Sequence, residues 1–308
     1  MSNQRENSPV LVLGGTGHYG QHIVQSLLQK GEPVRVLSRN VMNARKILGD
    51  EPELIEGDIT SKDSIIESLD GVKAIVISVA AFTRKTIRKM ELIERDSVHM
   101  VLDEALKTGI RRVVYISAYD LKEDVIKKLG IHLLAKIKLD IEATLAKSSL
   151  NWTILGAPPS MEIFFTTLRG TTLMFPASGS STLPTISPLD LGEIAAQTAL
   201  REDLNGKRFR ICCPKPLSFL EAAKHISNVT GKSIKFRRIP LTPIRVASIL
   251  TRPFNPYLWY LFLSIRLMNN FPPDIIAEVP KDHQLLVETF NYTPTTLEME
   301  ARRRGLGL

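Results

Sequence analysis

Short runs of apolar and often β-branched residues recur along the first half of the chain. Their positions are residues 10–13, 34–37, 53–56, 74–78, 112–117 and 152–155. Most of these runs are apolar at successive positions and not only at alternate ones. Strands that are buried on both faces, as in a parallel sheet, have this pattern. We therefore predict a parallel sheet built from these segments.

Between the apolar runs, apolar side chains recur at intervals of three and four residues. This helical spacing is clearest over residues 21–30, 98–106 and 133–147. Helices that connect parallel strands form right-handed crossovers and cover both faces of a sheet. The alternation therefore predicts an α/β fold with a doubly wound parallel sheet.

The pattern changes after Gly156, where prolines and serines punctuate residues 158–188. A helix over residues 191–200, a strand over 208–213, a helix over 218–229 that ends at Gly231, and a strand over 234–239 follow. Asp190 is expected to cap the first of these helices. The tail from Pro240 shows no clear pattern. We predict a domain over residues 1–157 and a smaller C-terminal lobe over 158–308, with parts of 182–213 returning to the main sheet.

A glycine-spaced loop directly follows the first predicted strand and opens the first predicted helix. Its sequence is Gly14-Gly-Thr-Gly-His-Tyr-Gly20. Such a loop turns tightly and directs the backbone amides of a helix N-terminus at an anion. In this context the spacing predicts a cradle for the pyrophosphate of a dinucleotide, formed by Gly14, Thr16, Gly17, His18, Tyr19 and Gly20. His18 is expected to act mainly through its backbone.

The ends of the next strands indicate which dinucleotide is bound. Sites for NAD carry an acidic residue about 20 residues past the loop, where this chain has Arg39. A guanidinium can bind a ribose 2′-phosphate, so we predict NADP (NADPH), with Arg39 as a solvated loop residue the alternative. Asp58 and Ile59 are expected at the adenine, although Asp58 could instead cap a helix. Ser78, Val79 and Ala80 are expected to line the nicotinamide half.

Several blocks of the sequence resemble the NmrA-like, atypical short-chain dehydrogenase/reductases. The resemblance covers about residues 8–240 and rests on residues 14–20, 36–40, 56–58, 109–117, 138–142, 150–155 and 186–190. It implies an NAD(P)-binding Rossmann fold with a smaller C-terminal substrate lobe. Members of the family reduce quinones and other carbonyl or double-bond substrates, or bind NADP chiefly as redox sensors and regulators.

The resemblance also implies roles for individual residues. Ser117 matches a serine beside the nicotinamide that can polarise a carbonyl, and Lys138 matches a lysine that holds the nicotinamide ribose and activates a hydroxyl. The tyrosine that donates the proton in active short-chain enzymes is replaced by Leu134. Tyr119 is the closest substitute by sequence. The other candidates for the donor are Tyr115, His132, Lys136 and Lys138 itself.

The composition argues against several classes of protein. The 308 residues are 44% hydrophobic and 23% charged, which is typical of a globular chain. Adjacent Cys212 and Cys213 exclude a disulfide framework, and the six histidines form no metal-binding pattern, so no metal site is expected. The net charge of +8 is spread over scattered basic pairs without a nucleic-acid recognition motif. It favours anionic small ligands, and no nucleic-acid partner is expected.

The most apolar window, residues 257–265, is about half as long as the roughly 20 residues that span a bilayer, so no transmembrane segment is expected. The polar start at residues 1–9 lacks the order of a secretion signal and, with the two cysteines, predicts a cytoplasmic protein. The aromatic segment 254–265 is expected to pack in a core, to wall a substrate pocket, or to form a partner or membrane-surface patch.

Together these features predict an NADP-dependent oxidoreductase that reduces a small hydrophobic carbonyl or quinone-type substrate by hydride transfer. The missing tyrosine favours the alternative of a non-catalytic NADP(H)-binding redox sensor or regulator. It also disfavours sugar-nucleotide epimerisation.

Overall fold

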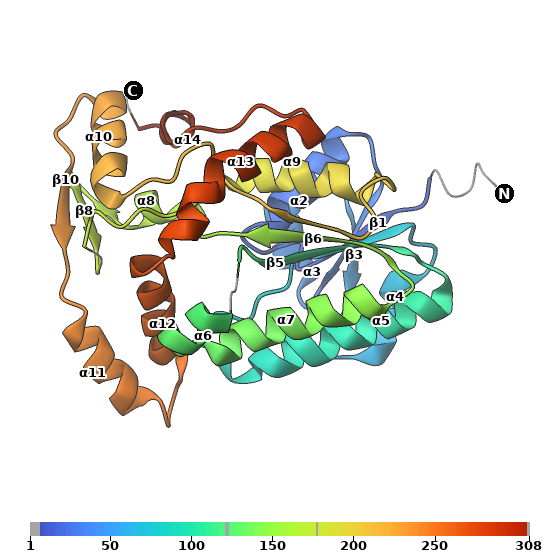
Figure 1. Ribbon diagram of the computed structural model, residues 1–308. Coiled ribbons are helices and arrows are strands. Elements are labelled where there is room, and N and C mark those ends of the chain that lie inside the picture. Colours follow the sequence, from blue (N-terminus) through green and yellow to red (C-terminus); the bar gives the residue numbers. More distant parts are fainter. Residues whose placement is uncertain (1–6, 121–122, 177, 307–308) are drawn as a thin grey trace.

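A computed structural model of the chain describes residues 7–120, 123–176 and 178–306, except for the side chains of residues 129, 133 and 134. Its central element is a seven-stranded parallel sheet with the strand order β3-β2-β1-β4-β5-β6-β9 (Figure 1). The predicted doubly wound α/β fold is confirmed. The strands are β1 (Val10–Leu13), β2 (Val34–Ser38), β3 (Glu53–Glu56), β4 (Ala74–Ile77), β5 (Arg112–Ala118), β6 (Asn151–Ala157) and β9 (Lys207–Arg210).

Both faces of the sheet are covered by helices, and this is why the strands are apolar at successive positions. Val10 and Val12 of β1 pack into the core on one face, while Leu11 and Leu13 pack into the core on the other. Figure 1 shows the two helical layers. The first consists of α2 (Gly20–Gln29), α3 (Val41–Leu48), α9 (Pro188–Ala199) and α13 (Pro273–Phe290), and the second of α4 (Lys62–Leu69), α5 (Ser97–Thr108) and α7 (His132–Lys147).

The strand order reverses direction beside β1, which pairs with β2 on one side and with β4 on the other. Ligands of open parallel sheets bind at such a switch point, in the crevice at the carboxyl ends of the strands. The glycine loop follows β1 directly. The topology therefore places this loop at the centre of the crevice.

A second, smaller unit is formed by the later part of the chain. Its three-stranded sheet has the order β10-β8-β7, and its core includes the stacked rings of Phe175 and Phe219, whose centroids are 4.4 Å apart. Its elements are β7 (Leu168–Arg169), β8 (Thr172–Phe175), β10 (Lys235–Arg238), α8 (Ile163–Thr166), α10 (Phe219–Thr230) and α14 (Leu297–Arg303). The predicted strand 234–239 thus lies in this sheet, whereas β9, α9 and α13 pack with the main sheet.

Most of the aromatic segment 254–265 lies in α12 (Tyr257–Asn269), which packs against α6 (Glu123–Leu129), α7 and the loop after β4. Tyr260, Phe262 and Leu263 are buried in this cluster, so core packing accounts for that part of the segment. The helix α11 (Thr242–Thr251) precedes it. Short helices η1 (Ile87–Lys89) and η2 (Leu92–Asp96, a π-helix) lie between β4 and α5. Within the described ranges, no helix has the length and apolar character to cross a bilayer.

The prediction that Asp190 caps α9 is wrong. The cap is Ser187, whose side chain accepts a hydrogen bond from the Leu189 amide. Asp190 lies in the first turn, and its buried carboxylate accepts hydrogen bonds from the Thr295 amide at 2.9 Å and the Thr295 hydroxyl at 2.5 Å. Burial raises the pKa of Asp190 to about 6, although the bonds to Thr295 partly oppose this. The carboxyl therefore fixes the segment before α14 against α9.

This buried carboxyl should make stability depend on pH. Because the pKa of Asp190 is higher in the folded than in the unfolded chain, its stabilising contribution is present below pH about 4 and is lost as the pH rises through about 6. Asp190→Asn removes this titration. Between pH 4 and 7 the variant should gain about 2–3 kcal/mol of unfolding free energy relative to the wild type, as measured by urea denaturation.

Asp63→Asn is the matched control, because Asp63 also lies in the first turn of a helix but is exposed. Its stability curve against pH should run parallel to that of the wild type. A parallel curve for Asp190→Asn as well would show that the buried carboxyl does not titrate in this range.

Candidate functional site

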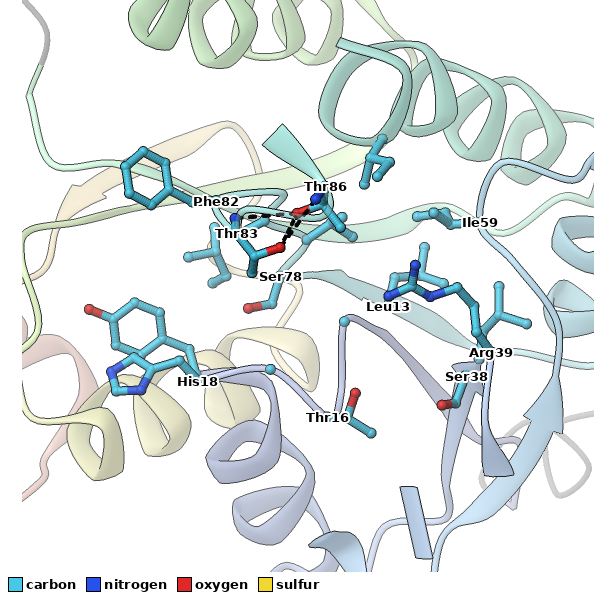
Figure 2. A pocket seen from close by; sticks show the side chains of 18 of the residues that line it. Leu13, Thr16, His18, Ser38, Arg39, Ile59, Ser78, Phe82, Thr83 and Thr86 are labelled. Atoms are coloured by element: carbon cyan, nitrogen blue, oxygen red, sulfur yellow. Dashed lines mark hydrogen bonds between the residues drawn. The ribbon is translucent and has the colours of Figure 1, made fainter. Parts of the chain in front are cut away.

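A cavity of about 680 Å³ lies at the carboxyl ends of β1, β2, β4, β5 and β6 (Figure 2). This volume is within the range of about 300–1,000 Å³ that is common for small-molecule sites. Of the site residues predicted from sequence, all except Gly20 and Tyr119 line it. They are Gly14, Thr16, Gly17, His18, Tyr19, Arg39, Asp58, Ile59, Ser78, Val79, Ala80, Ser117 and Lys138.

The glycine loop is shaped by very close backbone approaches. Gly14 has a φ of +81°, and a Cβ on it would lie 2.4 Å from the carbonyl oxygen of Ser78. A Cβ on Gly20, the first residue of α2, would lie 2.0 Å from the carbonyl oxygen of Gly14. The same oxygen accepts a hydrogen bond from the Gly17 amide at 2.8 Å. Gly20 therefore does not line the cavity, but its lack of a side chain lets the start of α2 lie directly against the Gly14 carbonyl.

The loop also presents unpaired backbone donors. The amides of Thr16, His18 and Tyr19 bond to none of the residues that the structure describes, and α2 has neither a side-chain cap nor an acidic residue in its first turn. A helix N-terminus with free amides attracts an anion. The His18 ring is engaged elsewhere, with Nδ1 3.0 Å from Glu162 Oε2. The ring is thus held by Glu162, and the role of the His18 backbone toward a phosphate stays a prediction.

Arg39 lies at the end of β2, and its side chain extends toward the middle of the cavity (Figure 2). It is exposed and forms no ion pair or hydrogen bond with any described residue. Arg35, on the same strand, instead donates to Glu53 at 2.8 Å and to the Ser68 carbonyl at 3.1 Å. Arg35 is therefore a structural residue, whereas the guanidinium of Arg39 is available for an anion.

Asp58 organises the turn after β3. Its Oδ1 accepts hydrogen bonds from the amide and the hydroxyl of Thr60, both at 2.9 Å. The cap of α4 is Ser61, which accepts from the Ser64 amide, so Asp58 is not the helix cap. Asp58 and Ile59 line the cavity beside β2, on the same side of the glycine loop as Arg39. Their contact with adenine stays a prediction.

Ser117 lies on the other side of the glycine loop, near the end of β5. Its hydroxyl donates to Glu142 Oε1 at 2.5 Å, and Glu142 is paired with Arg208 at 3.0 Å. A hydroxyl has a single proton to donate. With this proton directed at Glu142, the Ser117 oxygen can accept a hydrogen bond from a ligand, but it cannot also donate one to a carbonyl.

Lys138 reaches the cavity from α7 and is held by partners that the sequence did not indicate. Its Nζ lies 3.2 Å from Glu94 Oε2 and 5.2 Å from the centroid of the Tyr115 ring. Glu94 is buried in the π-helix η2, and its other oxygen accepts from the Ala81 amide at 2.6 Å. Burial lowers the pKa of Lys138, but the adjacent Tyr115 and Glu94 raise it by more. Its pKa is therefore above the ordinary value, and the ammonium stays charged at neutral pH.

The structure places the other proton-donor candidates away from the cavity. Tyr119 is buried, and its hydroxyl donates to Asp282 Oδ2 of α13 at 3.1 Å. Tyr115 lies behind Lys138 and does not line the cavity, while His132 and Lys136 are exposed on α7. The side chain of Leu134 lies outside the described part of the structure. Among the candidates it does describe, Lys138 is the one that lines the cavity.

The loop after β4 adds lining residues that the sequence analysis missed. Phe82, Thr83 and Thr86 border the cavity (Figure 2). The Thr86 hydroxyl donates to the Ala81 carbonyl at 2.8 Å. The Phe82 ring lies 5.9 Å from that of Tyr257 in α12. These residues could have been predicted from their position just after the carboxyl end of a strand, because such loops border the crevice of a parallel sheet.

Comparison with known proteins shows which family the first half of the chain matches. Residues 14–162 match the model of the NAD(P)H-binding family. Sterol demethylase protein B of Methylococcus capsulatus is 33% identical over 111 residues, which is 35% of this chain and 34% of that protein. The chain thus matches about a third of the length of this relative.

Two solved structures share the fold over almost their whole length. The triphenylmethane reductase of Citrobacter sp., complexed with NADP(H), has a TM-score of 0.71 and 18% identity, covering 96% of this chain and 99% of its own. The NADPH-dependent quinone oxidoreductase of Escherichia coli, complexed with NADPH, has a TM-score of 0.70 and 16% identity over the same shares. The chain therefore has an NAD(P)-binding Rossmann fold, and its residues 14–162 match an NAD(P)H-binding family, consistent with the resemblance to the NmrA-like, atypical short-chain dehydrogenase/reductases.

Proposed function

We propose that the protein is an NADP-dependent oxidoreductase that reduces a small hydrophobic carbonyl or quinone-type substrate by hydride transfer. The observation that carries the proposal is that a single cavity is lined by all of the expected groups. Arg39 and the glycine loop line one side of it, and Ser117 and Lys138 line the other. A nicotinamide cofactor supplies the hydride when it is bound. The chain supplies free amides for its phosphates and a guanidinium for the 2′-phosphate.

The charged Lys138 is the proposed source of the proton. Hydride addition to a ketone leaves an alkoxide, and a positioned acid typically accelerates such a step by about 10²–10⁴-fold. The ammonium lines the cavity and is held by Glu94. A quinone needs less assistance, because its reduced oxygen is a weaker base that water can protonate.

The lining near Lys138 supports a hydrophobic substrate. Val79, Phe82, Ile93 and Ile116 contribute apolar walls there. Phe82 also contacts Tyr257 of α12, so we propose residues 158–308 as the part of the chain that helps to form the substrate side.

Because both cysteines are free and buried, we propose the cytoplasm as the compartment.

A redox sensor that binds NADP(H) without turnover is the second candidate. The hydrogen bond from Ser117 to Glu142 favours it, since the serine proton is then withheld from a substrate carbonyl. Leu134 in place of the usual tyrosine points the same way. The two functions differ in one measurable property, which is consumption of NADPH.

Mixing the protein with NADPH and a panel of quinones and ketones should therefore cause loss of NADPH absorbance in a stopped-flow instrument. We expect quinones to react faster than ketones, because they need no strong acid. Tight NADPH binding without consumption by any acceptor would support the sensor instead.

Removing the ammonium should separate catalysis from binding. Lys138→Met should lower kcat at saturating NADPH by about 10²-fold or more with a ketone, and by less with a quinone. The single variant leaves the buried Glu94 carboxylate unpaired, which typically costs about 3–5 kcal/mol of stability. Lys138→Met combined with Glu94→Gln removes both charges and keeps the test usable. Lys136→Met, on the same helix but exposed, should leave kcat unchanged; an unchanged kcat in the double variant would exclude Lys138 as the donor.

Cofactor choice has its own test. Arg39→Ala should weaken NADPH binding by about 10- to 150-fold and NADH binding very little, since hydrogen bonds between charged groups contribute about 1.5–3 kcal/mol. Calorimetric titration gives both dissociation constants. Arg45→Ala is the control, because Arg45 is also exposed but is paired with Asp50. Equal losses for both cofactors in the Arg39 variant would contradict the assignment to the 2′-phosphate.

A further inference from the structure

A second cavity, of about 640 Å³, lies between α11 and α12 and shares no lining residue with the candidate active site. Three arginines and two aromatic rings dominate its wall. The lining residues are Leu241, Thr242, Arg245, Ile249, Arg252, Trp259, Phe262, Arg266 and Asn270. An acidic residue is not among them. Such a wall is suited to an anion that carries an apolar part.

The three guanidiniums have no carboxylate partner in the part of the chain that the structure describes. Arg252 lies over the Trp259 ring at 4.6 Å from its centroid, and Arg266 lies 5.7 Å from the centroid of Phe262. The rings support the flat guanidiniums while leaving their N–H groups free. Planar guanidiniums of this kind bind phosphate through paired hydrogen bonds.

Beside this cavity, α11 exposes large apolar side chains. Val246, Ile249, Leu250 and Phe254 are 50%, 52%, 68% and 77% exposed. Val246, Ile249 and Leu250 are three and four residues apart, so they share one side of the helix, and Phe254 follows in the turn after its end. We call these four residues the apolar stripe. The helix lies at an outer corner of the molecule, away from the main sheet (Figure 1).

Basic residues lie on α11 and on segments next to it. Arg245 and Arg252 lie on α11 and its C-cap, and Arg237 and Arg238 lie exposed on the preceding strand β10. The loop after β4 brings a further arginine, since the Arg84 carbonyl accepts a hydrogen bond from Asn255 at 3.3 Å. Exposed apolar side chains flanked by arginines are typical of helices that lie in the interface of an anionic membrane.

We propose that α11 and the turn through Phe254 bind the surface of an anionic phospholipid bilayer. The apolar stripe enters the headgroup region, and a lipid phosphate lies among Arg245, Arg252 and Arg266. Charge complementarity selects this occupant, because the cavity wall is wholly neutral or cationic and the chain carries a net charge of +8. The proposal is independent of the function proposed for the first cavity.

Flotation of the full-length protein with lipid vesicles tests it. Vesicles of phosphatidylglycerol and phosphatidylcholine in equal parts should carry the protein, vesicles of phosphatidylcholine alone should not, and added salt should weaken the binding. Arg245→Gln, Arg252→Gln and Arg266→Gln combined should lower the partition coefficient about 100-fold, because each arginine near an anionic surface is worth roughly fivefold. Leu250→Gln combined with Phe254→Gln should lower it at least about tenfold.

A matched control removes the same charge elsewhere. Arg45→Gln, Arg111→Gln and Arg302→Gln combined neutralise exposed arginines away from the second cavity, and this variant should bind vesicles much more tightly than the cavity variant. An unchanged midpoint of urea denaturation shows that every variant is folded. Equal losses in the two triple variants would overturn the proposal.

Two further outcomes would replace the bilayer by another occupant. If calorimetry detects inorganic phosphate or glycerol phosphate in the cavity while the wild type does not float with anionic vesicles, the site takes a free anion. If sedimentation shows a dimer that Leu250→Gln and Phe254→Gln abolish, and the wild type does not float, the apolar stripe is an interface between two copies of the chain. Either result overturns the proposal.

Discussion

Two close backbone contacts, of Gly14 with the Ser78 carbonyl and of Gly20 with the Gly14 carbonyl, are the constraint on which the rest of the site depends. The first strand ends and the first helix begins within a few residues, and a methyl group at either glycine would collide with a backbone carbonyl. The compact turn leaves the amides of Thr16, His18 and Tyr19 without a partner among the residues that the structure describes. Backbone donors that cannot pair internally need an external acceptor. The packing of the loop thereby creates the binding capacity at the switch point of the sheet.

The parts of this arrangement that the sequence predicted are local ones. Burial on both faces leaves an uninterrupted apolar run in a strand, so β1 and β4 could be recognised. Residues that were predicted to bind the cofactor, and that line the cavity, follow these strands directly. Glu94 and Glu142 could not be recognised, because they meet Lys138 and Ser117 only through contacts between distant helices and strands. The helices after residue 240 were missed for a related reason. Pro280 interrupts the pattern of α13, and the packing of that helix on the sheet overrides the local signal.

Behind the cavity wall at Ser117 and Lys138 lie two carboxylates, each paired with a cation. Glu94 is paired with Lys138, and Glu142 with Arg208. These pairs fix opposite hydrogen-bonding roles for the two side chains that line the cavity there: the ammonium donates, and the serine oxygen accepts. Because Glu94 also binds the Ala81 amide, the position of Lys138 is coupled to the loop after β4 that carries Phe82. Lys138 and the loop that carries Phe82 are thus held together through Glu94.

The helix α13 has a consequence for how the chain reaches its native state. Ile275, Val279, Leu286 and Phe290 belong to the same core as β1 and α2, and Arg210 of β9 pairs with both Glu278 and Asp282 of this helix. On that face α2, α3 and α9 cover the earlier strands, and α13 completes the layer beside β9. During synthesis β9 emerges well before the end of α13, and apolar surface that is exposed in the interval is prone to aggregate. The surface beside β9 is covered only once translation has passed Phe290.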